Sequence, residues 1–228
     1  MSATSAPKDM IVSYASAFIN NSKLRAEFIS YRPDVSRYEN QLLSAGANGM
    51  IQYLTNPADD IRSTLDNKGN AIEYLLVLFQ VLKDVKGNEK LTSWVLLFLD
   101  GMLEDNRTRI ENLVAIQRSH KKEKKEDLIS ILLDFITANN LQDCIQRDTA
   151  AHVLAMLIEA TGYKHCAQQA KSFLAWIVIP EKNKITPAAY SSSLMYLIKV
   201  NELAREFYER NGMGQLSKML ETECLDDY

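Results

Sequence analysis

The sequence predicts an all-α fold built from stacked helical hairpins. Apolar residues recur at intervals of three and four along much of the chain, and only a helical period of about 3.6 residues brings such positions onto one face. No block shows the alternation of a half-buried strand. The clearest blocks hold Ile72, Leu75, Leu76, Phe79 and Leu82; Leu91, Val95, Phe98 and Met102; and Leu128, Leu132, Phe135 and Ile136.

The stretches that join these blocks are short and polar. Residues 86–89, 138–140 and 162–165 read Lys-Gly-Asn-Glu, Ala-Asn-Asn and Gly-Tyr-Lys-His. Links this short make consecutive helices antiparallel neighbours, and a single helix pair cannot bury both of its faces. We therefore expect the hairpins to stack into a right-handed α-solenoid. Such a stack offers a surface for holding partners rather than a reaction chamber.

The helices follow from these blocks and from the residues that stop them. Pro33 and Pro57 end helices near the N-terminus, because proline cannot continue a helix. An amphipathic piece near 58–66 leads into the regular region. We expect helices at about 9–21, 23–31, 35–43, 47–55, 71–86, 89–105, 107–119, 126–138, 145–161, 165–179, 187–200, 202–211 and 214–222.

Three helix ends have a chemical explanation in the sequence. Pro180 should end the helix at 165–179, because proline lacks an amide donor and clashes with the preceding turn. Thr186 followed by Pro187 fits an N-cap and a first helical position. Asn211-Gly212 can adopt positive φ and close the helix before it.

Composition and charge restrict the classes of function. The chain has 228 residues, of which 46% are hydrophobic, and its 26 basic and 29 acidic residues give a net charge of −3. A folded domain with a real core fits these values, and no overall charge attracts nucleic acid or anionic lipid. The strongest apolar run, Trp94 to Leu99, is interrupted by Asp100 and is far short of the roughly 20 residues that span a bilayer. We expect neither nucleic-acid binding nor direct membrane insertion.

The compartment is predicted from the cysteines and the N-terminus. Cys144, Cys166 and Cys224 are odd in number and widely spaced, which is typical of a reducing compartment. The first nine residues hold no apolar stretch of the secretory kind. The sequence predicts a cytoplasmic protein.

No residue cluster indicates a metal site. His165-Cys166 is the only adjacent His/Cys pair, and zinc needs four converging ligands. We interpret the pair as the junction between two helices. His152, between Ala151 and Val153, is expected to be a packed side chain rather than a catalyst.

The patterns of common enzyme sites are also missing. The sequence contains neither a phosphate-binding glycine loop nor a nucleophile elbow around Ser191–Ser193, and Gly46–Gly49 follows no strand. The acidic pairs Asp59-Asp60 and Asp226-Asp227 are interpreted as solvated, because adjacent carboxylates on a helix point in different directions. We predict no catalytic, cofactor-binding or metal-binding residues and no cofactor.

A basic stretch stands out between residues 107 and 127. Seven positive and four negative side chains give 7 − 4 = +3 within an acidic protein. The stretch is either a solvated loop or a docking point for an acidic partner helix. Aromatic residues do not interleave with its lysines, which argues against a platform for single-stranded nucleic acid. The charges are Arg107, Arg109, Arg118, Lys121, Lys122, Lys124 and Lys125 against Glu111, Glu123, Glu126 and Asp127.

One internal echo supports a repeat architecture. Asn48-Gly-Met-Ile-Gln52 is similar to Asn211-Gly-Met-Gly-Gln215, at an offset of 211 − 48 = 163 residues. This offset is close to four periods of about 41, within the range of armadillo and HEAT repeats.

Several passages resemble the H subunit of the vacuolar-type proton ATPase (V-ATPase). Trp94–Arg109 looks like that family's helix-and-turn segment. Leu194–Leu216 is similar to its later helix pair, in which a leucine-rich helix runs into an Asn-Glu-x-x-Arg segment, an aromatic residue and a glycine turn. Ala170–Ile177 lies between the two, and Ser44–Leu54 precedes them in the expected order. Within the later helix pair, Glu202 and Arg205 are three residues apart and are expected to interact.

The resemblance implies an armadillo/HEAT-like solenoid that takes no part in catalysis. In the family, the N-terminal domain docks on the peripheral stalk of subunits E and G. A C-terminal domain reaches the head and rotor and silences ATP hydrolysis after detachment. The resemblance therefore implies a regulatory or assembly component of the cytosolic sector, peripheral on the cytosolic face of acidified organelle membranes, among the other subunits of that sector.

The expected organisation is one solenoid domain at 9–222 between a flexible start at 1–8 and an acidic tail at 223–228, with the family's C-terminal domain absent. An alternative is a free-standing armadillo/HEAT-type adaptor that binds peptides or helices of other proteins. The sequence does not indicate which surface binds a partner.

Overall fold

A computed structural model describes residues 75, 78–79, 81–83, 89–105, 109–122, 127–137 and 144–226. Within these ranges every regular element is helical, which confirms the all-α prediction. The expected helices before residue 71, the start at 1–8 and most of the helix at 71–86 lie outside the described residues. The helices are α6 (Glu89–Asp105), α7 (Arg109–Lys122), α8 (Leu128–Thr137), α9 (Cys144–Thr161), α10 (Tyr163–Ile177), α11 (Pro180–Asn183), α12 (Pro187–Leu197), α13 (Asn201–Glu209) and α14 (Gly212–Asp226).

Helix α9 is the centre of the described core. Ala150, Ala151 and every residue from Val153 to Ile158 are fully buried, whereas a surface helix buries only one face. The surrounding helices explain this, because α6, α7, α8, α10 and α12 all pack against α9. Each large aliphatic side chain buried there contributes about 1.5–3 kcal/mol to folding.

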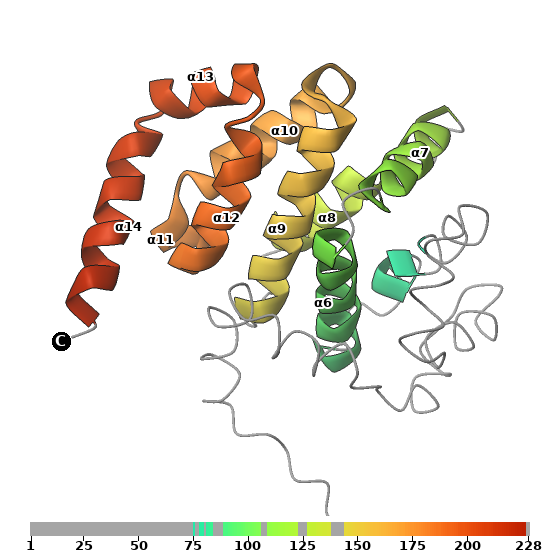
Figure 1. Cartoon of the computed structure of the whole chain (residues 1–228), viewed down its shortest axis with the longest axis horizontal. Coiled ribbons are helices and arrows are strands. Elements are labelled where there is room, and N and C mark those ends of the chain that lie inside the picture. Colours follow the sequence, from blue (N-terminus) through green and yellow to red (C-terminus); the bar gives the residue numbers. More distant parts are fainter. Residues whose placement is uncertain are drawn as a thin grey trace, which may run out of the picture.

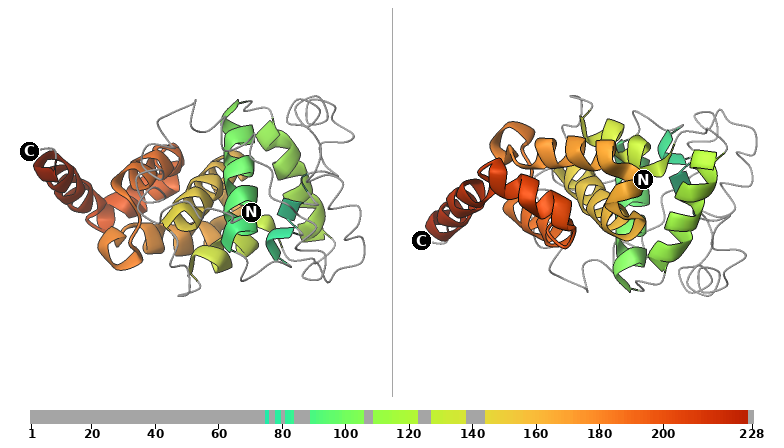
Figure 2. Two further views of the ribbon diagram at one scale, coloured as in Figure 1. Left: turned by 90° about the horizontal axis from the view of Figure 1, so that it is seen from below. Right: turned by 90° about the horizontal axis from the view of Figure 1, so that it is seen from above.

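The helices form two rows. Helix α9 lies between α6 and α12, and α12 in turn contacts α14, so these four stand side by side across the molecule (Figure 1). Helix α10 contacts both α8 and α13, which gives a second, shorter row. The two views in Figure 2 show the same progression, from α6 and α7 near one end to α14 at the other.

Two predicted helix boundaries are confirmed in chemical detail. The Thr186 hydroxyl oxygen accepts a hydrogen bond from the Ala189 amide at 3.3 Å, and Pro187 occupies the first helical position of α12. Asn211 adopts the expected positive φ of 58° after α13. Gly212 was expected to close α13, but it is instead the first residue of α14, where it is buried against the Phe207 ring.

Pro180 does follow the end of a helix, but that helix is two residues shorter than predicted. Helix α10 already ends at Ile177, and Pro180 opens the short helix α11. The preceding Ile179 has φ −120°, as expected for a residue before proline, and the first helical position needs no amide donor. Helix α10 also begins at Tyr163 rather than 165, with a non-helical kink at Cys166.

Two helices extend beyond their predicted ends. Helix α7 runs to Lys122, so Lys121 and Lys122 lie on a helix and not in a loop. Helix α14 runs to Asp226, so residues 223–226 of the expected tail are helical. No glycine or proline follows either predicted end to stop the helix.

Candidate functional site

A deeply buried polar pair joins α6 to α9. Nδ1 of His152 lies 2.6 Å from Oδ1 of Asp100, and the two side chains are only 2% and 1% exposed. The His152 ring also lies 5.5 Å from the ring of Tyr196 on α12. His152 is therefore a packed side chain, as predicted. Because the pair is closed to solvent, its evident role is to link helices.

A second polar cluster fixes the connection between α11 and α12. Asp148 on α9 accepts two hydrogen bonds from Thr186, one from its hydroxyl at 2.6 Å and one from its amide at 3.2 Å. Its neighbour Arg147 donates to the carbonyl of Lys184 at 2.6 Å. On the preceding residue, the Gln146 amide donates to Ser93 on α6 at 3.0 Å. These consecutive polar residues of α9 thus hold the helices on either side of it.

Part of the basic stretch also serves the fold. Asp127 caps α8, because Oδ1 accepts from the Ser130 amide at 2.8 Å, and Oδ2 accepts from Gln169 of α10 at 3.2 Å. Arg109 is only 4% exposed at the start of α7, whereas Arg118 is exposed. The side chains of residues 119–126 lie outside the described parts of the structure.

The side chains of the adjacent residues His165 and Cys166 lie in different environments. His165 is exposed, while Cys166 is 2% exposed and its Sγ contacts the carbonyl of Gly162 at 3.5 Å. Nowhere in the described ranges do three His, Cys, Asp or Glu side chains gather as metal ligands would. The side chains of Cys144 and Cys224 are not described. Among the described helices, none is long and apolar enough to cross a membrane.

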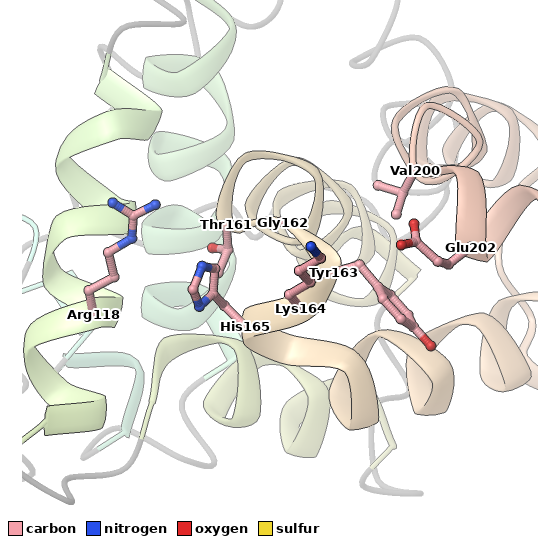
Figure 3. A pocket seen from close by; sticks show the side chains of 8 residues that line it. All are labelled: Arg118, Thr161, Gly162, Tyr163, Lys164, His165, Val200 and Glu202. Carbon is pink, nitrogen blue, oxygen red and sulfur yellow. The ribbon is translucent and has the colours of Figure 1, made fainter.

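A solvent-open hollow lies where three parts of the fold meet. It has a volume of about 360 Å³ and lies between α7, the α9–α10 turn and the α12–α13 turn (Figure 3). Six of its eight lining residues have polar or charged side chains. The residues are Arg118, Thr161, Gly162, Tyr163, Lys164, His165, Val200 and Glu202.

Large apolar side chains are exposed towards the C-terminal end of the described chain. Met195 and Ile198 are 61% and 47% exposed, and they are three residues apart around the end of α12. Tyr208 on α13 is 75% exposed and Met213 on α14 is 56% exposed. Exposed apolar side chains of this size are candidates for contact with other proteins.

These features define a class of protein: a packed helical scaffold whose buried polar groups hold helices together. Comparison with protein families identifies the scaffold. The family model for the H subunit of V-ATPases matches residues 36–226, a range that includes every helix described above. The chain therefore belongs to the V-ATPase H-subunit family and represents its N-terminal domain. Members of this family are non-catalytic accessory components of the pump.

Comparisons with curated proteins and with solved structures found no match. The family match includes Trp94–Arg109 and Leu194–Leu216, the two longest passages on which the resemblance depended. In the second passage, Glu202 and Arg205 were expected to interact. The structure shows both exposed, and the ion pair it records on this helix joins Arg210 to Glu206 at 2.7 Å.

Proposed function

We propose that this chain is a regulatory or assembly component of the cytosolic sector of a V-type proton-pumping ATPase and docks on the peripheral stalk formed by subunits E and G. The observation that carries the proposal is the family match over residues 36–226. The pump's catalysis is assigned to other subunits, and this chain supplies a binding surface. It would work peripherally, on the cytosolic face of acidified organelle membranes.

The architecture that we propose for this role is an irregular α-solenoid at residues 9–222. Its two rows would be α6, α9, α12 and α14, and α8, α10 and α13. The step from the start of α9 to the start of α12 is 187 − 144 = 43 residues, within the range of about 40–47 for armadillo and HEAT repeats. The step from the start of α6 to the start of α9 is 144 − 89 = 55 residues, and the step from α12 to α14 is 212 − 187 = 25 residues. The repeat length therefore varies along the row, which is why we call the solenoid irregular.

A row of helices suits the recognition of another helix. Helix α9 is enclosed by five other helices, whereas α12 and α14, at the C-terminal end of the row, carry exposed side chains that a long partner helix could contact. The exposed apolar residues Met195 and Ile198 support such a role, because apolar anchors dominate the binding energy of many helix-recognition surfaces.

A pull-down with purified E–G heterodimer tests the proposal. The immobilised heterodimer should retain the full chain at micromolar concentration, while an unrelated helical-repeat protein of similar size should wash through. Absence of binding even at about 100 μM would remove the claim that the chain docks on the stalk. The remaining candidate would then be an adaptor for other helices or peptides.

A further inference from the structure

We propose that the hollow shown in Figure 3 receives an acidic side chain from a helical protein partner. This inference rests on the proposed function and makes it more specific, because it names the surface of this chain that contacts the stalk and the chemistry that the surface recognises. Three observations support it: the charge of the lining, a buried hydroxyl without a partner, and the open shape.

The hollow is basic within an acidic protein. Arg118 and Lys164 against Glu202 give 2 − 1 = +1, whereas the chain as a whole has a net charge of −3. Arg118 and Lys164 are both exposed, and among the described residues neither has an ion-pair partner. Figure 3 shows Arg118 standing on one flank of the hollow and Lys164 near the centre, so the charges come from two separate elements. A guanidinium group binds a carboxylate through two parallel hydrogen bonds, which favours an acidic occupant.

The wall of the hollow also contains an unsatisfied hydrogen-bonding group. Thr161, the last residue of α9, is 3% exposed, and its hydroxyl has no hydrogen-bond partner. In Figure 3 this hydroxyl is directed towards the flank that carries Arg118. Buried hydroxyls are nearly always hydrogen-bonded in folded proteins, so an unpaired one calls for an explanation. The hydroxyl oxygen is covered in the free protein, so the carboxylate of a partner would become the missing acceptor once the side chains that cover the hydroxyl move aside.

The shape of the hollow suits a side chain presented by another protein. Pockets that enclose small molecules bury most of the ligand, but this hollow of about 360 Å³ is wide open to solvent. Its lining comes from two turns that connect helices and from one side of α7. A partner helix could therefore pass over the hollow and place a Glu or Asp side chain in it.

The test measures the affinity of the full chain for purified E–G heterodimer by isothermal titration calorimetry. Double substitution Arg118→Glu with Lys164→Glu should weaken binding at least tenfold in about 50 mM salt, and the difference should shrink as salt screens the charges. The matched control reverses Lys171 and Lys182, which are exposed on α10 and α11 but do not line the hollow. Its affinity should stay within twofold of the wild type.

Two milder variants separate charge from hydrogen bonding. Glu202→Gln removes the negative charge from the lining and should tighten binding about twofold. Thr161→Val keeps the side-chain shape and removes a hydroxyl that has no partner in the free protein, so it should melt no lower than the wild type and yet bind about tenfold more weakly.

The outcomes distinguish this inference from the proposed function. If the wild type binds E–G and the hollow variants bind equally well, the inference is wrong and the docking function stands. If the wild type does not bind at all, both fail. If Glu202→Gln weakens binding, the occupant is not acidic and the inference is overturned.

Discussion

The link between Asp100 and His152 allows the contribution of a buried polar contact to be measured against an exposed one. Replacing each residue by alanine, singly and together, gives a double-mutant cycle whose coupling energy isolates the contact. Both side chains interact with further residues as well, so each single substitution costs more than the coupling itself.

The expected magnitude follows from burial. At 2.6 Å and with 1–2% exposure, the contact is a short hydrogen bond that water cannot replace, and hydrogen bonds to charged groups contribute about 1.5–3 kcal/mol. The chain provides a matched control in Arg210 and Glu206, at 2.7 Å but 43% and 19% exposed. An exposed i,i+4 pair is worth only about 0.3–0.5 kcal/mol.

Urea unfolding of both cycles, followed by circular dichroism at pH 7, measures the two coupling energies. We expect the Asp100–His152 coupling to exceed the Arg210–Glu206 coupling by at least about 1 kcal/mol. Equal couplings, or a value below about 0.5 kcal/mol for the buried pair, would refute the conclusion that this contact joins α6 to α9.

Three further predictions concern Tyr190, Gly212 and Gly162. Burial raises the pKa of Tyr190 to about 12, so the free energy of unfolding should fall as the pH rises past about 10, the ordinary tyrosine value. Tyr190→Phe should remove this loss. It should leave stability at pH 7 unchanged or higher, because the Tyr190 hydroxyl has no hydrogen-bond partner. Gly212→Ala should destabilise by about 1–3 kcal/mol because a Cβ would overlap the Phe207 ring; Phe207→Leu in the same chain should recover part of the loss in a thermal melt. Gly162→Ala meets no neighbouring atom and should cost about 1–3 kcal/mol through the backbone conformation alone (φ 83°, ψ 138°); recovery of that loss by Phe207→Leu in a thermal melt would contradict this assignment.

Local patterns in the sequence predicted the described helices from α6 to α14, except for the short α11. The apolar spacing at 89–105 matches the bounds of α6, and the block at 145–161 differs from α9 by one residue. Thr186-Pro187 marked the start of α12 because capping depends on residues adjacent in sequence. The start of α11 at Pro180 was not predicted, because proline can both follow the end of one helix and begin another, and the sequence alone does not show that a second helix follows.

Contacts between distant residues could not be predicted in this way. Asp100 read as an interruption of an apolar run, and only the packing of α6 on α9 brings it to His152, 52 residues away. The hollow likewise depends on the meeting of Arg118, Lys164 and Glu202 from separate helices. A sequence signal existed for Arg118, which belongs to the basic stretch, but nothing marked Thr161.

The membership of this chain in an assembled pump is tested most directly by native co-purification. Affinity purification of the tagged full chain from cells, followed by mass spectrometry of the intact complex, should recover the stalk subunits E and G together with the other subunits of the cytosolic sector. Recovery of the chain alone, or with helical partners unrelated to the ATPase, would contradict the docking function.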